Sequence, residues 1–138
     1  MDKGNDAILS EDEVKRYVKL WLRKNKGYGI VEVNYGRKMG IDIHAYTKKG
    51  KREWIIEAKG SGNNNKKYAQ NARYNNYFLG ALGELIQKMD KNNVKYSIAV
   101  PLYQKYERLW EELPQIAKKR LKISIIFVDA KGRCKEVG

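Results

Sequence analysis

Two neighbouring segments decide the fold of this chain: Gly40-Ile41-Asp42-Ile43-His44-Ala45-Tyr46 and Glu53-Trp54-Ile55-Ile56-Glu57-Ala58-Lys59. Residues 41–46 of the first segment largely alternate apolar and polar side chains and the second segment is richer in apolar residues, so both are predicted to be β-strands. The short polar turn between them, Thr47–Lys51, predicts an antiparallel hairpin. If Lys49 and Gly50 form the centre of its loop, the numbers of paired residues add up to 99, as 49 and 50 do. Asp42 then lies opposite Glu57, because 42 and 57 also add up to 99.

This register gathers charged side chains on one side of the predicted sheet. Side chains alternate along a strand, so Asp42, Glu57 and Lys59 share one face. A three-residue turn would shift the pairing by one and place the two carboxylates on opposite faces. Like charges directly opposite each other are destabilising, so the Asp42–Glu57 pair calls for a cation. Mg²⁺ prefers oxygen ligands and commonly binds through one or two carboxylates, and Mn²⁺ may substitute for it.

Helices and further strands are predicted on both sides of this hairpin. Ser10 and Glu13 form a capping box that opens a helix, and a second long helix is predicted over residues 66–90. Strands are predicted over residues 30–35, 96–100 and 122–129, and a helix over 104–120 that Pro114 kinks or divides. This order predicts an α/β fold in a single domain over residues 1–138. The architecture is a three-layer sandwich, with a mixed central sheet of about five strands flanked by helices.

The composition favours a polyanionic partner. The chain has 29 Lys and Arg residues against 16 Asp and Glu residues, a net charge of +13. For 138 residues this excess favours nucleic acid as the partner over a membrane surface. The single cysteine, Cys134, excludes an intramolecular disulfide and a Cys-rich zinc site. Without an apolar run of roughly 18 residues or a secretory signal pattern, we expect no membrane span and a cytoplasmic location.

The two opening segments resemble the signature of a known nuclease superfamily. Gly40-Ile41-Asp42-Ile43, followed by Trp54-Ile55-Ile56-Glu57-Ala58-Lys59-Gly60, is similar to the core of the PD-(D/E)xK, or restriction-endonuclease-like, nucleases. The resemblance implies metal-dependent cleavage of DNA or, less often, of RNA. It also implies that Asp42 and Glu57 are metal ligands and that Lys59 is the catalytic lysine. Ile41 stands where the nominal proline would be, a departure that is frequent in the family.

Two further residues enter the predicted site through this resemblance. Many members carry an acidic residue on the first helix that reaches the metal directly or through water. Glu13 is favoured for this role over Glu11, although Glu13 could equally be only the capping partner of Ser10. Gln70 and Tyr74 resemble the QxxxY motif of the RecB-like branch, which makes Gln70 a catalytic-site candidate with Gln87 as its rival.

Basic and aromatic side chains near the predicted site are candidates for contact with nucleic acid. Solvated surface is the alternative for the basic ones, and ordinary helix packing for the tyrosine. The candidates are Arg37, Lys38, Lys66, Lys67, Arg73 and Tyr74.

The resemblance, together with the basic charge, implies a Mg²⁺-dependent endonuclease that hydrolyses nucleic-acid phosphodiester bonds, with DNA favoured as substrate. A junction-resolving, repair or defence enzyme fits the small size, and a homodimer would bring two sites to two strands. Two alternatives predict no cleavage: a nucleic-acid-binding module on the same fold, and a basic RNA-binding protein without nuclease ancestry.

Overall fold

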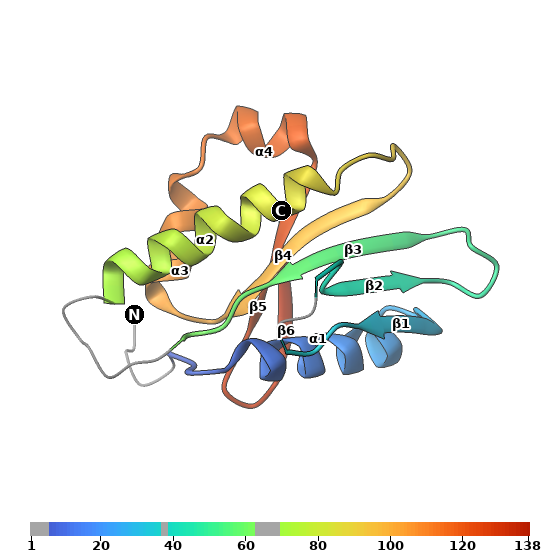
Figure 1. Cartoon of the computed structure of the whole chain (residues 1–138), viewed down its shortest axis with the longest axis horizontal. Helices are drawn as coiled ribbons and strands as arrows, with labels where there is room; N and C mark the ends of the chain where they lie inside the picture. Colours follow the sequence, from blue (N-terminus) through green and yellow to red (C-terminus); the bar gives the residue numbers. More distant parts are fainter. Residues whose placement is uncertain (1–5, 37–38, 63–69) are drawn as a thin grey trace.

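A computed structural model describes residues 6–36, 39–62 and 70–138. Within these ranges the chain forms four helices and six strands (Figure 1). In chain order they are α1 (Glu11–Asn25), β1 (Ile30–Val33), β2 (Ile43–Tyr46), β3 (Glu53–Ala58), α2 (Gln70–Gln87), β4 (Lys95–Pro101), α3 (Gln104–Glu112), α4 (Gln115–Leu121), β5 (Ile123–Val128) and β6 (Cys134–Val137). None of the described helices is both long enough and apolar enough to cross a lipid bilayer.

The strands form one mixed sheet in sequence order, from β1 to β6. β1, β2 and β3 are antiparallel neighbours, β3, β4 and β5 run parallel, and β6 returns antiparallel to β5. The predicted α/β fold with a mixed central sheet is confirmed. The four-residue strand β6 was not among the predicted strands, because its sequence is short and charged. Pro114 divides the predicted last helix into α3 and α4.

Helices cover both faces of the sheet and produce the three layers. On one face, α1 packs its apolar positions Val14, Val18 and Leu22 against side chains of β2 and β3. On the other face, α2 and α3 pack Phe78, Leu85 and further apolar residues against β3, β4 and β5. Figure 1 shows α2 beside β3 and β4, and α1 on the opposite side of the picture, below β1. α1, α2 and α3 thus each bury one apolar face, whereas α4 has no buried residue.

The β2–β3 hairpin has the predicted register. Ile43 pairs with Ile56 and His44 with Ile55, and the numbers of each pair add up to 99. The turn allows this register because Gly50 adopts a positive φ of 66°, a conformation that L side chains rarely take. Asp42 directly precedes β2, and its Oδ2 accepts a hydrogen bond of 2.9 Å from the backbone N–H of Ala58.

The end of β3 lies against the chain that enters α1. The backbone N–H of Ser61 donates to the carbonyl of Leu9 at 2.7 Å, and the N–H of Leu9 donates to Ser61 Oγ at 3.1 Å. Between them Gly60 leaves no room for a side chain, since a Cβ there would lie 2.3 Å from the backbone nitrogen of Glu11. This contact fixes the first turn of α1 beside the residues that follow β3.

Candidate metal and nucleic-acid site

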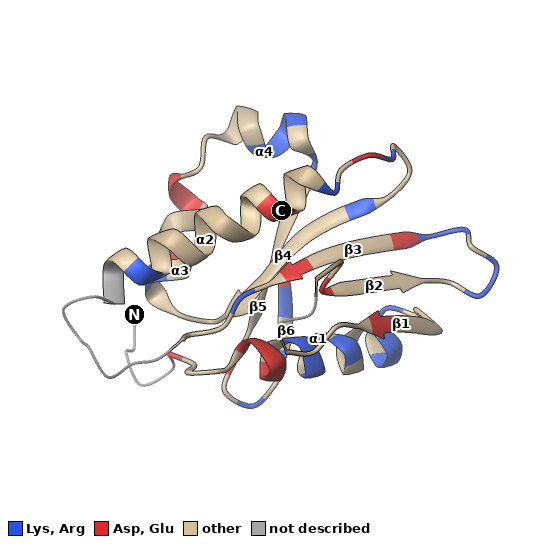
Figure 2. Cartoon of the chain, viewed as in Figure 1, with Lys and Arg blue, Asp and Glu red and all other residues tan. Residues whose placement is uncertain are grey.

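Three carboxylates from three separate segments converge at the end of β3. Asp42 comes from the entry to β2, Glu57 from β3 and Glu84 from α2, and one oxygen of each lies within 4.8 Å of the others. The side chain of Glu57 is 1% exposed and that of Asp42 is 13% exposed, while that of Glu84 is 44% exposed. Figure 2 shows acidic residues at the end of β3 and on the facing part of α2. The set therefore has two covered oxygen donors and one that solvent can reach.

Glu57 is the most deeply buried of the three carboxylates. Among the described residues its one cationic partner is Lys88, whose Nζ lies 2.7 Å from Oε1, while Oε2 has no hydrogen-bond donor. Burial, together with the neighbouring Asp42 carboxylate, raises the pKa of Glu57 to about 8 against the lowering effect of Lys88. A buried carboxylate with one oxygen left unsatisfied is costly, and a hard divalent cation would satisfy it. The donor set therefore fits Mg²⁺ or Mn²⁺.

Lys59 lies beside the carboxylates on the same face. Its side chain is 22% exposed and its Nζ is 3.4 Å from Glu84 Oε1. Its backbone N–H donates to the carbonyl of Ala99, which extends the pairing of β3 with β4. Of the sequence-predicted set, the structure thus brings Asp42, Glu57 and Lys59 together.

A second lysine, Lys15 of α1, lies behind Asp42 and is 1% exposed. Its Nζ is 2.6 Å from the carbonyl oxygen of Asn34, 2.9 Å from Glu11 Oε2 and 3.6 Å from Asp42 Oδ1. Burial lowers the pKa of Lys15, but the hydrogen bond with Glu11 and the charges of Asp42, Glu11 and Asp12 outweigh it, so the pKa is raised. Lys15 is therefore a charged ammonium inside the protein.

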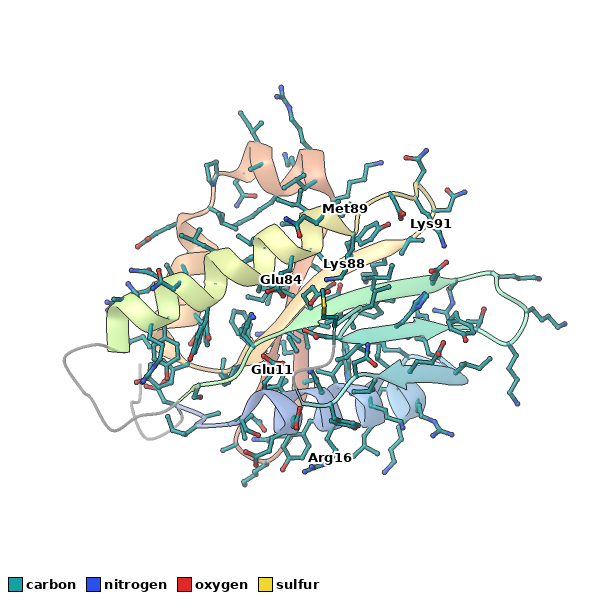
Figure 3. The ribbon with its side chains drawn as sticks, in the orientation of Figure 1. Glu11, Arg16, Glu84, Lys88, Met89 and Lys91 are labelled. Atoms are coloured by element: carbon teal, nitrogen blue, oxygen red, sulfur yellow. The ribbon has the colours of Figure 1, made fainter. Side chains whose placement is uncertain are left out.

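An open cavity of about 430 Å³ gives access to these groups. Its walls come from the start of α1, the segment before β2, the end of β3 and the C-terminal part of α2. Figure 3 labels three of its residues, Glu11 on α1, Glu84 on α2 and Lys88 directly after α2. The lining residues are Glu11, Gly36, Met39, Gly40, Asp42, Lys59, Glu84, Gln87 and Lys88. A larger cavity of about 730 Å³ beside α4 is lined by only one acidic side chain, Glu136, so it offers no comparable donor set.

The structure places Glu13 away from the carboxylates. Its Oε1 accepts the backbone N–H of Ser10 at 2.9 Å, and its own N–H donates to Ser10 Oγ at 3.1 Å, as in the predicted capping box. The third residue of a capped helix points back to the N-cap, which turns it from the sheet. Glu11 lines the cavity instead. The cap interpretation therefore accounts for Glu13, and we do not retain it among the proposed metal ligands.

The motif around Gln70 is described only in part. α2 begins at Gln70, whose side chain lies outside the described residues, while its rival Gln87 lines the cavity. Tyr74 is 1% exposed and packs in the core, stacked on Tyr103 with ring centroids 4.7 Å apart. A ring buried in this way cannot contact nucleic acid in this conformation, so packing is the role that the structure gives it.

Among the predicted basic contacts, only Arg73 can be placed. It is half-buried, and its guanidinium carbon lies 5.9 Å from the centre of the Tyr74 ring. The other four lie outside the described residues: Arg37, Lys38, Lys66 and Lys67.

Glu84, Lys88 and Lys15 are residues that the sequence reasoning missed. Glu84 carried a usable signal, because it is the one acidic residue of α2 and is spaced three residues from the buried Ala81. Residues three or four apart share a helix face, so Glu84 had to lie near the covered side. Lys15 carried a weaker signal, a lysine next to Val14 in the apolar stripe of α1.

Comparison with known proteins gives a likeness of fold alone. No protein-family profile and no curated protein sequence matches the chain. An XisH family protein from Nostoc punctiforme is similar in structure, with a TM-score of 0.52 and 16% identity, over 92% of this chain and 100% of that one. An fdxN element excision controlling factor protein from Anabaena variabilis has a TM-score of 0.50 and 17% identity, over 92% and 99%. The chain shares its α/β fold with these two structures.

Proposed function

We propose that this chain is a divalent-metal-dependent endonuclease that hydrolyses nucleic-acid phosphodiester bonds, with Mg²⁺ as cofactor and DNA as substrate. One observation carries the proposal: Glu57, a carboxylate that is 1% exposed and has one oxygen without a hydrogen-bond donor, lies within 4.8 Å of two further carboxylates. A purely structural sheet would gain nothing from such a group. The resemblance of the Asp42 and Glu57-Ala58-Lys59 segments to the PD-(D/E)xK signature supports the same reading.

In the proposed reaction each side chain has a separate task. Asp42, Glu57 and Glu84 would hold the cation, and a divalent cation bound there would supply positive charge to a phosphate oxygen and activate water for attack. Lys59, whose ammonium lies 3.4 Å from Glu84, orients the attacking water or offsets the negative charge that develops on the phosphate. Lys88, at the cavity wall, offers a second ammonium to the substrate.

The charge distribution supports nucleic acid as the partner. The net charge is +13, although several carboxylates gather in the site. Figure 2 shows Lys and Arg along α1, in the β2–β3 turn and on α4. Such a surface attracts a polyanion through its phosphates, whatever its sequence. The name of one structural neighbour, an excision controlling factor, would suit a protein acting on DNA. We propose that the enzyme acts on DNA in junction resolution, repair or defence.

One alternative has an observation in its favour. Lys88 and Lys59 each pair with a carboxylate of the cluster, at 2.7 and 3.4 Å, so part of the acidic charge is already balanced. A nucleic-acid-binding module that has kept the fold and does not cleave would look the same in this respect. It predicts binding that is insensitive to divalent cations.

A cleavage assay separates the two. Labelled duplex, single-stranded, flap, four-way-junction and RNA substrates are incubated with Mg²⁺, Mn²⁺ or EDTA and with wild type, Lys59→Ala or Lys91→Ala. Lys91 is the matched control, because its ammonium is 60% exposed and lies outside the cavity lining. Metal-dependent cleavage that Lys59→Ala abolishes and Lys91→Ala retains supports the nuclease. Binding without cleavage under every condition would leave the binding module.

A further inference from the structure

Lys15 is held like a bound cation. Its side chain is 1% exposed, and four oxygens surround its Nζ within 4.0 Å: the carbonyl of Asn34 and carboxylates of Glu11, Asp12 and Asp42. Hard divalent cations take the same kind of donors, carboxylates and a carbonyl. The Lys15 ammonium therefore has the positive charge and the oxygen neighbours that a bound divalent metal ion would have.

The Lys15 ammonium lies on the α1 side of Asp42, where a second metal ion would have to bind. Asp42 Oδ1 is 3.6 Å from Lys15 Nζ, and Asp42 Oδ2 accepts the N–H of Ala58. Glu11, the one residue of α1 that lines the cavity, is also engaged by Lys15, at 2.9 Å. A second divalent cation bridging Asp42 and Glu11 would have to displace a buried ammonium and its hydrogen bonds.

We propose that the site holds a single divalent cation and that Lys15 replaces a second one, so that Glu11 positions Lys15 and does not bind metal. This inference rests on the proposed function and adds the number of cations to it. The cation is held from the β3 and α2 side, by Glu57, Glu84 and Asp42.

The balance of charge around the cavity agrees with one cation. Five carboxylates (Glu11, Asp12, Asp42, Glu57 and Glu84) face three ammonium groups (Lys15, Lys59 and Lys88). With all carboxylates ionised, these eight groups carry two excess negative charges, which one divalent cation neutralises. A second divalent cation would leave two positive charges close together before substrate binds, which Coulomb repulsion disfavours.

The test counts bound metal and does not depend on activity. Purified variants are dialysed to equilibrium against Mn²⁺, and bound Mn²⁺ per chain is measured by metal analysis, with circular dichroism to verify folding. We expect one Mn²⁺ in wild type and none in Glu57→Gln. Glu11→Gln should retain one Mn²⁺ with its affinity within about twofold of wild type, as for a group outside the coordination sphere. Folded Lys15→Met should bind two. Lys19→Met, one turn further along α1, is the matched control and should bind one.

Several results would overturn the inference. They are two Mn²⁺ in wild type, loss of Mn²⁺ or affinity weakened by about tenfold or more in Glu11→Gln, or a single Mn²⁺ in folded Lys15→Met. If Lys15→Met does not fold, wild type and Glu11→Gln decide. Failure of the proposed function would give a different result. Wild type would then bind no Mn²⁺ at Glu57, so Glu57→Gln and wild type would bind the same amount.

Discussion

The two sides of the carboxylate cluster differ in how firmly they are held. On the α1 side, Lys15 is 1% exposed and contacts four oxygens. On the α2 side, Lys59 and Lys88 are 22% and 25% exposed, and each has one ion pair with a cluster carboxylate. Buried, multiply paired charges are costly to disturb, whereas a partly exposed ammonium with one partner is cheaper to remove when that partner is exposed or can take up a proton. The α1 side is therefore built to stay in place, and the α2 side can exchange its ammonium groups for metal and substrate.

The largest expected effect on stability comes from removing Lys15 on the α1 side. Lys15→Met removes the buried ammonium and leaves Glu11 and Asp42 without their cation, which should lower the free energy of unfolding by about 3 kcal/mol. Lys88→Met, on the exchangeable side, should lower it by less than about 1 kcal/mol, because its side chain is partly exposed and Glu57 can take up a proton. Urea denaturation of both variants measures the difference, and equal losses would contradict the distinction between the sides.

A second effect concerns pH on the exchangeable side. Burial and the neighbouring Asp42 carboxylate raise the folded-state pKa of Glu57 to about 8 from its ordinary value of 4.5, so the folded state favours the neutral carboxyl. The stabilisation is then fully present below about pH 4.5 and is lost as the pH rises through about 8. Without metal, the unfolding free energy of wild type relative to Glu57→Gln should fall across this window, by on the order of 2 kcal/mol. Denaturation at several pH values in EDTA measures it. A constant difference between the two proteins would refute the prediction.

A third effect compares the two sides as metal ligands. Glu84→Gln should weaken Mn²⁺ binding by about tenfold, or ~1.4 kcal/mol, because it removes one charged oxygen donor from the cluster. Calorimetric titration at pH 8.5 gives the affinity, and the exposed Glu112→Gln serves as control for the loss of one negative charge elsewhere. If Glu84→Gln binds Mn²⁺ as wild type does, α2 contributes no ligand.

The smallest effect separates the two glutamates of α1. Glu13→Ala should cost about 0.5–1 kcal/mol of stability by opening the capping box, with no change in Mn²⁺ affinity. Thermal unfolding and metal titration of the same sample measure both quantities. Weakened Mn²⁺ binding in Glu13→Ala would return this residue to the metal site.

The sequence predicted the part of the site that a local hairpin builds. Asp42 and Glu57 could be paired from the turn alone, because Gly50 permits its tight geometry and the strand pattern fixes the faces. Glu84 could not be placed in the same way, since it depends on how α2 is rotated over the sheet. That rotation follows from packing of residues such as Phe78 and Leu85 against strands far along the chain.

The choice between Glu11 and Glu13 shows a second limit. Both stand in the first turn of α1, and a general family pattern cannot tell them apart. Helix geometry could have done so, because Glu11 lies four residues before Lys15 and therefore on the same side as the buried lysine. Tyr74 is a similar case, since its burial depends on Tyr103 and Tyr106, which come from a distant part of the chain.

Two parts of the site form at different stages of folding: the hairpin first, and then the contact of Gly60 and Ser61 with the chain that enters α1. The hairpin that joins Asp42 to Glu57 is local in sequence, but the Leu9–Ser61 hydrogen bond links residues separated by 52 positions. Non-local contacts form late in folding, because closing long loops is entropically costly. A chain with only its hairpin formed would hold two carboxylates without the α1 side. A site with all its charges in place therefore exists only once α1 has docked against the end of β3.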